Sequence, residues 1–270
     1  MDNIVYEIEL AARGAGEIVR NAHGLDLGIE NKEGRANFVT KYDTMVQDYL
    51  VNRLGKILPD ARFLGEESGL DQFQSGADKG YLFVIDPIDG TTNFIHNMHP
   101  HVVSIGLFKD GVPWAGVVYA PATDELFSAQ KGQGAYENGC RIHSSTRPLS
   151  ENIMLVGSSG FSLEAYSISQ KMAFEFQSKC QGIRSLGSSE YSLCMIASGR
   201  VGGYTEMRLG LWDFAAGSVI LEEAGGTVTD FYRRPLTYRE GCGIVALCKG
   251  IAQDPQMPDT GAYMTLWSQA

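Results

Sequence analysis

The segment YLFVIDPIDGTTNF, at residues 81–94, limits what this chain can fold into more than any other part of the sequence. Its apolar beginning predicts a buried strand, and two aspartates, Asp86 and Asp89, follow at the end of that strand. A charge is costly to bury unless it is paired or binds a metal. Asp-Pro and Asp-Gly are also common turn dipeptides, so a plain turn is an open alternative. The position favours a ligand site, because open α/β sheets bind ligands beyond the carboxyl ends of their strands.

The turn formed by these residues could direct two carboxylates and the backbone carbonyl of Ile88 to one point. Such oxygen ligands suit hard cations such as Mg²⁺. Gly90 allows the backbone to turn closely, and Thr91 would then begin a helix whose amide groups could hold a phosphate. The segment therefore predicts a site for magnesium and phosphate.

Three further segments place acids at the ends of predicted elements. FLGEES ends an apolar strand in Glu66 and Glu67, GLWDFAAG begins a helix with Asp213, and NKEGRANFVTKYD places Lys32 in a turn and Asp43 at a helix start. Each has a simple alternative: a solvated loop for the glutamates, and a favourable helix dipole for the aspartates. Taken together with DPIDGTTNF, the four segments predict one shared acidic site.

Apolar periodicity predicts both helices and strands along the chain. Helices are expected at 3–22, 41–58, 163–179, 190–199 and 212–224. Strands are expected at 62–65, 81–86, 182–185, 202–207, 227–230 and 243–248, with a short hairpin at 26–39 and a meander at 101–139. Asp110-Gly111 and Asn138-Gly139 are strong hairpin turns within that meander. Met45 is expected to point inward from its helix, and Phe174 and Phe176 to lie in the core.

This order of elements suggests two layered units that share one body, an α+β half at 1–140 and an α/β half at 141–270. The net charge of −10 over 270 residues argues against a general binder of nucleic acid or anionic membranes. No basic region precedes a long apolar run at the start, so no signal peptide or membrane span is expected. The five scattered cysteines are expected to be free thiols. We therefore expect a cytoplasmic protein.

DPIDGTTNF, with GEES upstream and WDFAAG and EEAGG downstream, resembles the inositol monophosphatase family from about residue 8 to about residue 230. The resemblance implies a layered αβαβα sandwich of mixed α+β and α/β character. It implies a Mg²⁺-dependent, lithium-sensitive phosphatase that acts on a small phosphorylated polyol or sugar. It also implies a homodimer.

The resemblance further implies roles for single residues. The implied metal ligands are Glu66, Asp86, the Ile88 carbonyl, Asp89 and Asp213. Glu66 is also implied in catalysis, together with Asp43 and Thr91, which would orient the nucleophilic water. The implied substrate-binding residues are Gly90, Thr91, Ser188, Ser189 and Glu206. Lys32 matches a lysine of the family's early loop. Most of the implied metal ligands lie in the first half of the chain, whereas Asp213 and the substrate-side residues lie in the second half.

The chain departs from the family pattern in two places. Asn37 stands where the family commonly has an acid near a third, weak metal site. GSSEYS, at 187–192, replaces the small and apolar residues usual on the substrate side. These departures leave open the strength of the third metal site and the preferred substrate.

Charge suggests the mechanism. A phosphate monoester is a dianion that several carboxylates would repel, and bound metal ions reverse that local field and activate water. We expect direct attack by a metal-activated water on the phosphate, without a covalent phosphoenzyme. The resemblance implies myo-inositol 1-phosphate as the main substrate. Fructose 1,6-bisphosphate, histidinol phosphate and 3′-phosphoadenosine phosphate are alternative substrates.

Three other interpretations are open. An aspartyl-phosphate mechanism needs a second Asp two positions after the first, whereas Asp86 and Asp89 are three apart. A non-catalytic, protein-binding role is known among bacterial relatives of the family and would be an additional function here. A zinc site at His96, His99 and His101 would need further ligands.

Overall fold

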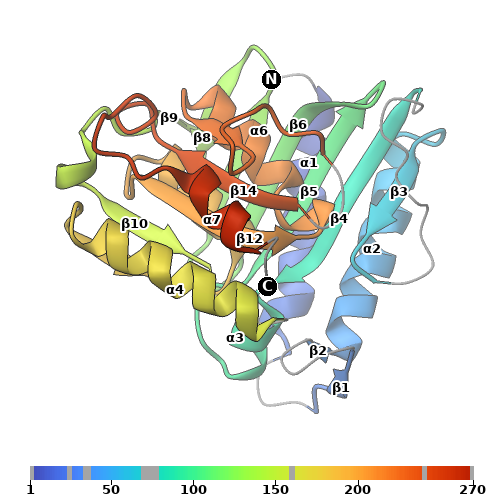
Figure 1. Cartoon of the computed structure of the whole chain (residues 1–270). Coiled ribbons are helices and arrows are strands. Elements are labelled where there is room, and N and C mark those ends of the chain that lie inside the picture. The colour runs from blue at the N-terminus through green and yellow to red at the C-terminus, as the bar shows by residue number, and fades with distance from the viewer. Residues whose placement is uncertain are drawn as a thin grey trace.

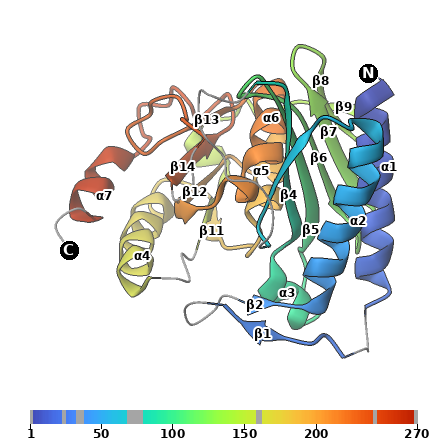
Figure 2. The ribbon, with the colours of Figure 1, turned by 90° about the vertical axis from the view of Figure 1, so that its right-hand side faces the viewer.

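The structure is a five-layered sandwich in which helices and sheets alternate (Figures 1 and 2). The computed structural model describes residues 3–22, 26–32, 38–67, 79–157, 162–238 and 242–267. Across Figure 2 the layers are a helix pair, a seven-stranded sheet, a second helix pair, a five-stranded sheet and a third helix pair. The expected layered αβαβα sandwich is confirmed.

The seven-stranded sheet follows the order of the chain from β3 to β9. Its strands are β3 (Arg62–Gly65), β4 (Tyr81–Asp89), β5 (Val102–Lys109), β6 (Val112–Ala120), β7 (Glu125–Gln130), β8 (Gly134–Glu137) and β9 (Cys140–Ile142). β3 and β4 run parallel, and all later neighbours pair antiparallel as the predicted meander requires. Asp110-Gly111 and Asn138-Gly139 have positive φ at both residues, as hairpin turns of this kind require.

Two helices, α1 (Asn3–Arg20) and α2 (Lys41–Ile57), form the outer layer on this sheet, close to the predicted ranges. Thr40 caps α2, and the carboxylate of Asp43 accepts a hydrogen bond from the Thr40 amide, so the two residues form a capping box. The buried stripe of α2 runs through Tyr42, Val46, Leu50 and Leu54. Met45, expected to point inward, is 48% exposed. That expectation was wrong because position 45 lies beside the stripe that recurs every fourth residue.

The five-stranded sheet has the order β11-β10-β12-β14-β13. Its strands are β10 (Ile153–Val156), β11 (Gly182–Arg184), β12 (Gly203–Leu209), β13 (Thr227–Thr229) and β14 (Cys242–Leu247). β10 pairs parallel with β11 and β12, while β14 pairs antiparallel with β12 and β13. β10 was not predicted, since its uniformly apolar run of four residues does not by itself distinguish a strand from a helix.

The two inner helices, α5 (Ser189–Ala197) and α6 (Ala215–Glu223), lie between the sheets. Both are buried over most of their length, as expected for helices covered on two sides. Outside the smaller sheet lie α4 (Leu163–Gln177) and α7 (Thr260–Trp267), of which α7 was not predicted. Phe176 of α4 is buried as expected, whereas Phe174 is 81% exposed, so its assignment to the core was wrong.

Short elements complete the fold: β1 (Glu30–Asn31), β2 (Phe38–Val39), α3 (Thr91–Ile95) and two single 3₁₀ turns, η1 (Leu149–Glu151) and η2 (Leu211–Asp213). β1 and β2 pair antiparallel as the predicted hairpin requires, but Asn37 lies outside the described residues. All five cysteines are free. No helix in the described ranges is long and apolar enough to cross a bilayer. The division into halves at residue 140 stays a prediction.

Candidate active site

The end of β4 explains how two aspartates spaced three apart come to face the same way. Asp86 pairs with Ser104 on β5, and Asp89 pairs with Val102, so β4 has one extra residue between these pairs. Side chains of a regular strand alternate, which would place Asp86 and Asp89 on opposite faces of the sheet. The β-bulge restores a common face, and Pro87, which has no amide hydrogen to donate, is tolerated at such a bulge.

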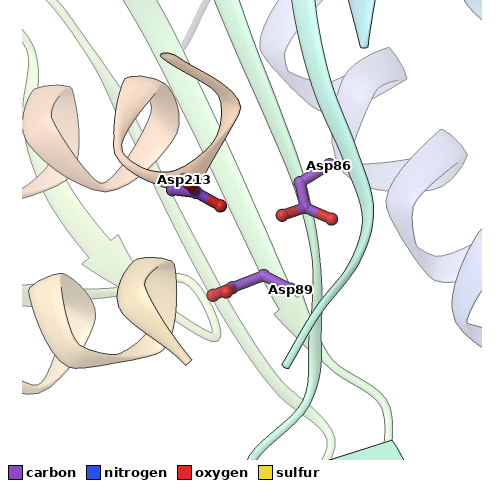
Figure 3. A group of neighbouring side chains, drawn as sticks. All are labelled: Asp86, Asp89 and Asp213. Carbon is purple, nitrogen blue, oxygen red and sulfur yellow. The ribbon is translucent and has the colours of Figure 1, made fainter. Parts of the chain in front are cut away.

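Asp213, in η2 just before α6, completes a group of three carboxylates. One oxygen from each of Asp86, Asp89 and Asp213 lies within 4.8 Å of the other two. Figure 3 shows the three side chains directed toward one shared space, two from β4 and one from the turn that precedes α6. Within the described ranges this is the only group of three or more His, Cys, Asp or Glu residues close enough to share an ion. The three histidines of the zinc alternative therefore do not form such a group.

Each of the three carboxylates is held by hydrogen bonds from the protein. Asp86 Oδ1 accepts from the Ile88 amide at 3.0 Å, and Asp213 Oδ2 accepts from the Gly210 amide at 2.6 Å. Asp89 accepts from three donors at the start of α5, which are the Ser188 hydroxyl at 2.6 Å, the Ser189 amide at 3.2 Å and the Glu190 amide at 2.8 Å. The carboxylates are therefore fixed before any ligand arrives.

The pKa values of the three carboxyl groups show that no positive charge of the described residues compensates them. Burial, followed by the charges of Glu66 and Asp89, raises the pKa of Asp86 and of Asp213 well above the usual value. Burial also raises the pKa of Asp89 to about 6, although hydrogen bonds from the start of α5 oppose the rise. Among the described residues no basic side chain forms an ion pair with any of the three. A set of carboxylate oxygens without a basic side-chain partner fits a hard divalent ion.

Glu66 lies at the end of β3 and meets a lysine. Lys32 Nζ is 3.0 Å from Glu66 Oε1 and 2.6 Å from Glu67 Oε1. Burial raises the pKa of Glu66, and the Lys32 charge opposes that rise. The predicted loop lysine thus faces Glu66, a predicted metal ligand, and Glu67 is a second partner that the sequence-based assignment left without a role.

Asp43 and Thr91, predicted to act together, do lie together. Thr91 Oγ1 is 3.4 Å from Asp43 Oδ1 and 3.0 Å from the Ile88 carbonyl oxygen. The other Asp43 oxygen accepts from the amide and the hydroxyl of Thr40, at 2.7 and 2.6 Å. Burial raises the pKa of Asp43 to about 6. Oδ1 is therefore the oxygen of Asp43 that faces the candidate site.

Gly90 links the acids to α3 at a position that requires glycine. Its φ is +94°, and a Cβ there would lie 3.0 Å from the Gly187 carbonyl oxygen and 3.1 Å from that of Pro100. Both the backbone conformation and the tight space therefore disfavour a side chain.

The substrate-side residues form a second polar group. Ser189 Oγ and the Tyr204 hydroxyl are 2.9 Å apart, and Tyr204 lies 3.4 Å from Glu206 Oε2. Glu206 Oε1 accepts from the Met207 amide. A Cβ at Gly157 would lie 1.6 Å from Glu206, so glycine is needed for that carboxylate to sit against the backbone. Ser188, predicted on this side, uses its hydroxyl to bind Asp89.

Sequence reasoning missed several residues that contact the predicted ones, among them Thr40, Ser104 and Tyr204. Tyr204 precedes Glu206 by two positions on one strand, so alternation alone could have placed both on one face. The capping box pattern could have revealed Thr40. Ser104 meets the site only through the register of β4 and β5, which no local pattern contains. The roles of all site residues stay predictions.

Several known proteins have sequences similar to this chain over most of its length. The sequence profile of the inositol monophosphatase family matches residues 1–263. An inositol-1-monophosphatase of Bacillus subtilis is 34% identical over 234 residues, which are 87% of this chain and 88% of that protein. The Nus factor SuhB of Escherichia coli K12 is 35% identical over 223 residues, 82% of each chain.

A solved structure agrees with the sequence relatives. An inositol monophosphatase from Thermotoga maritima superimposes with a TM-score of 0.85 at 29% identity, covering 100% of this chain and 99% of that one. The profile match covers nearly the whole chain, and both sequence relatives exceed 30% identity over most of it. This chain belongs to the inositol monophosphatase family.

Proposed function

We propose that this protein hydrolyses a small phosphate monoester in a Mg²⁺-dependent reaction, with myo-inositol 1-phosphate as the preferred substrate. One observation carries the proposal: three carboxylates, the buried Asp86 and Asp89 and the partly buried Asp213, converge within 4.8 Å and lack a basic partner among the described residues. Membership of the inositol monophosphatase family supports the same reaction class.

The proposed ligands are these three aspartates, with Glu66 and the Ile88 carbonyl. When bound there, Mg²⁺ would neutralise the phosphate dianion and lower the pKa of the attacking water. The fit rests on the donor set, since all five groups offer the oxygen atoms that Mg²⁺ prefers.

Asp43 and Thr91 would orient the water and accept its proton. Two hydrogen bonds from Thr40 occupy Asp43 Oδ2, which leaves Oδ1 for the Thr91 hydroxyl. When that hydroxyl donates to Asp43, its oxygen can accept a hydrogen bond from the water. A carboxyl group with a pKa of about 6 is suited to accept a proton near neutral pH.

The amides of Gly90 and Thr91 would contact the phosphate, and Glu206 would accept a hydrogen bond from a substrate hydroxyl. Glu206 is 6% exposed and already has partners in Tyr204 and Met207, so its orientation is fixed. A fixed carboxylate favours a polyol, whose hydroxyls donate, over a leaving group that has none. Ser189 would adjust this preference through Tyr204.

The test is phosphate release from myo-inositol 1-phosphate, fructose 1,6-bisphosphate, histidinol phosphate and 3′-phosphoadenosine 5′-phosphate, each with Mg²⁺ and with a chelator. We expect release that needs Mg²⁺ and is fastest with inositol phosphate. Mg²⁺-dependent release that is fastest with another member would keep the site and change the substrate. Release from none of them would overturn the proposed activity.

A second, protein-binding role is a further proposal, and the similarity to a protein named Nus factor SuhB favours it. Such a role would use the surface and not the acids. In a strain that depends on this protein, Asp89→Asn should then keep the phenotype that deletion removes. Loss of the phenotype in both strains would assign it to catalysis.

Family membership also supports three properties that are proposed here. They are inhibition by lithium, a homodimeric state and a cytoplasmic location, the last in keeping with five free cysteines. Activity assays with LiCl against a KCl control test the first. Light scattering of the full chain after size-exclusion chromatography tests the second, and cell fractionation tests the third.

A further inference from the structure

Glu190 is a buried carboxylate without an established task. Its side chain is fully buried in the first turn of α5, and in the described part of the chain no basic side chain forms an ion pair with it. Instead, Glu190 Oε1 accepts from the Ala216 amide at 3.0 Å and Oε2 from the Gly217 amide at 2.5 Å. The Ser104 hydroxyl lies 3.3 Å from Oε1. Since a buried charge is costly unless it is hydrogen-bonded, this arrangement calls for a reason.

The backbone of the same residue binds a proposed metal ligand. The Glu190 amide donates to Asp89 Oδ2 at 2.8 Å, beside the donors of Ser188 and Ser189. Glu190 thus contacts Asp89 through its amide and the start of α6 through its carboxylate. One residue therefore joins two segments that are far apart in the sequence.

The side-chain contacts reach the other two aspartates as well. The amides that Glu190 binds begin three residues after Asp213, at the start of α6. Ser104 Oγ lies between Glu190 Oε1, at 3.3 Å, and the carbonyl oxygen of Trp212, at 3.4 Å. Ser104 is also the cross-strand partner of Asp86. Glu190 is therefore at the point where the segments carrying all three carboxylates meet.

Glycine at position 217 is part of this arrangement. A Cβ there would lie 2.5 Å from Glu190 Oε2 and 2.7 Å from Leu193 Cβ. The carboxylate can reach the backbone of α6 only because this residue has no side chain. The close contact between α5 and α6 thus depends on the pair of Glu190 and Gly217.

We propose that Glu190 is a positioning residue that holds Asp86, Asp89 and Asp213 at the spacing that a divalent cation requires. The inference rests on the proposed metal-dependent function. Residues that orient metal ligands strongly affect metal affinity even though they do not touch the ion. A residue that only stabilised the fold would change the melting temperature and leave the metal affinity of the folded protein unaltered.

The experiment measures Mn²⁺ binding to the full chain, without substrate, by electron paramagnetic resonance well below the melting temperature. Glu190→Asp keeps the carboxyl group but is too short to reach both amides, whereas Glu190→Gln keeps the length and replaces the carboxyl group with an amide. We expect both variants to weaken Mn²⁺ binding by about tenfold or more. If Glu190→Asp binds Mn²⁺ like the wild type while Glu190→Gln binds it weakly, only the carboxyl group matters and not its reach to the two amides. That result would overturn the positioning role.

Glu223→Gln is the matched control. Glu223 lies at the opposite end of α6 and also accepts two backbone hydrogen bonds, from Gly132 and Gly134 at 2.8 Å each. Its replacement should lower stability and leave Mn²⁺ affinity unchanged. An equal loss of affinity in Glu223→Gln would show a general effect of loosening α6 and would overturn the inference.

Ser104→Ala decides the question if the Glu190 variants do not fold. It removes one hydrogen bond to Glu190 and should weaken Mn²⁺ binding by about threefold. Unchanged affinity would overturn the inference. If the wild type releases phosphate from a monoester with Mg²⁺ but the variants bind Mn²⁺ normally, the positioning role alone is refuted. A wild-type protein that neither binds Mn²⁺ nor releases phosphate refutes the proposed function, and the inference with it.

Discussion

Two groups of acids in this protein have opposite surroundings. At the end of β4, Asp86 and Asp89 face Asp213 without a basic partner among the described residues, and burial raises their pKa values. Between β7, β8 and α5, Glu125 and Glu137 instead share Arg200, with Arg200 Nη1 2.8 Å from Glu125.

The pKa of Glu125 shows the consequence. Burial alone would raise it, but hydrogen bonds from Thr123 and Tyr191 and the charge of Arg200 bring it below its usual value. The acids paired with Arg200 are thus neutralised within the protein, whereas Asp86 and Asp89 have no such partner among the described residues, which supports the proposal that they bind a cation. The comparison separates a structural use of acidic residues from a functional one.

The largest expected effect comes from neutralising one acid in each group. Asp89→Asn should lower phosphate release by at least about a thousandfold, equivalent to about 4 kcal/mol of barrier, because a proposed metal ligand is lost. Its metal-free melting temperature should not fall much, since repulsion among the acids decreases. Glu125→Gln should do the reverse, with normal turnover and a lower melting temperature. Substantial turnover by Asp89→Asn would contradict the contrast.

Stability of the metal-free protein should fall as the pH rises. Asp43 and Asp89 have folded-state pKa values of about 6 against 3.8 for the free group, so the folded state binds protons more tightly. Their contribution is full below pH 3.8 and lost above pH 6, which amounts to about 3 kcal/mol for both between pH 5 and pH 8.

Chemical denaturation in a chelator at pH 5, 6, 7 and 8 measures this slope. Added Mg²⁺ should stabilise the protein more at pH 8 than at pH 5, because protons no longer compete for the carboxylates. The double variant Asp43→Asn, Asp89→Asn is the control and should show a flatter profile. Rising stability over this range in the metal-free wild type would contradict the prediction.

Lys32 tests whether the proposed cation site, to which Glu66 belongs, also has an internal competitor for the cation. Its ammonium group contacts Glu66 and Glu67, so Lys32→Met should tighten Mn²⁺ binding by roughly tenfold, about 1.4 kcal/mol. Calorimetric titration measures the change. Lys179→Met is the control, because Lys179 pairs with Glu175 on the outer helix α4. Weaker binding in Lys32→Met would mean that the lysine supports the site and does not compete for it.

The smallest effect is expected in the paired group. Arg200→Ala should lower the free energy of unfolding by about 1 kcal/mol, because the guanidinium is partly exposed and solvent weakens such pairs. Phosphate release should stay unchanged. Equilibrium unfolding in urea gives the first value, and the phosphate assay gives the second. A clear loss of activity would mean that the two groups of acids are coupled through α5.

Much of the fold was accessible from local patterns. The strand at 81–86, the meander with its Asp-Gly and Asn-Gly turns, and most helices were predicted close to their observed bounds. These elements have strong periodicity or specific turn residues. The strand β10 and the helix α7 were missed because their generally apolar segments show no clear periodicity. Phe174 was misplaced because an apolar side chain alone does not indicate which face of a helix is covered.

For the candidate site, too, some features were accessible from the sequence and others only from the structure. Motifs and spacing drew attention to Asp86, Asp89 and Asp213, because acids beside apolar runs are unusual and need an explanation. Local pattern could not supply the bulge that turns Asp86 and Asp89 to one face. It also could not supply the contact of Ser104 with Glu190, whose positions are 86 residues apart.

The sequence by itself determined most of the elements, the family and the presence of several acids at element ends, because those depend on neighbouring residues and on a dense motif. Only the tertiary structure decided which acids share a space, which are neutralised by Arg200, and that Glu190 bonds to the start of α6. Distances between remote segments follow from sheet register and helix packing, which depend on the whole chain at once.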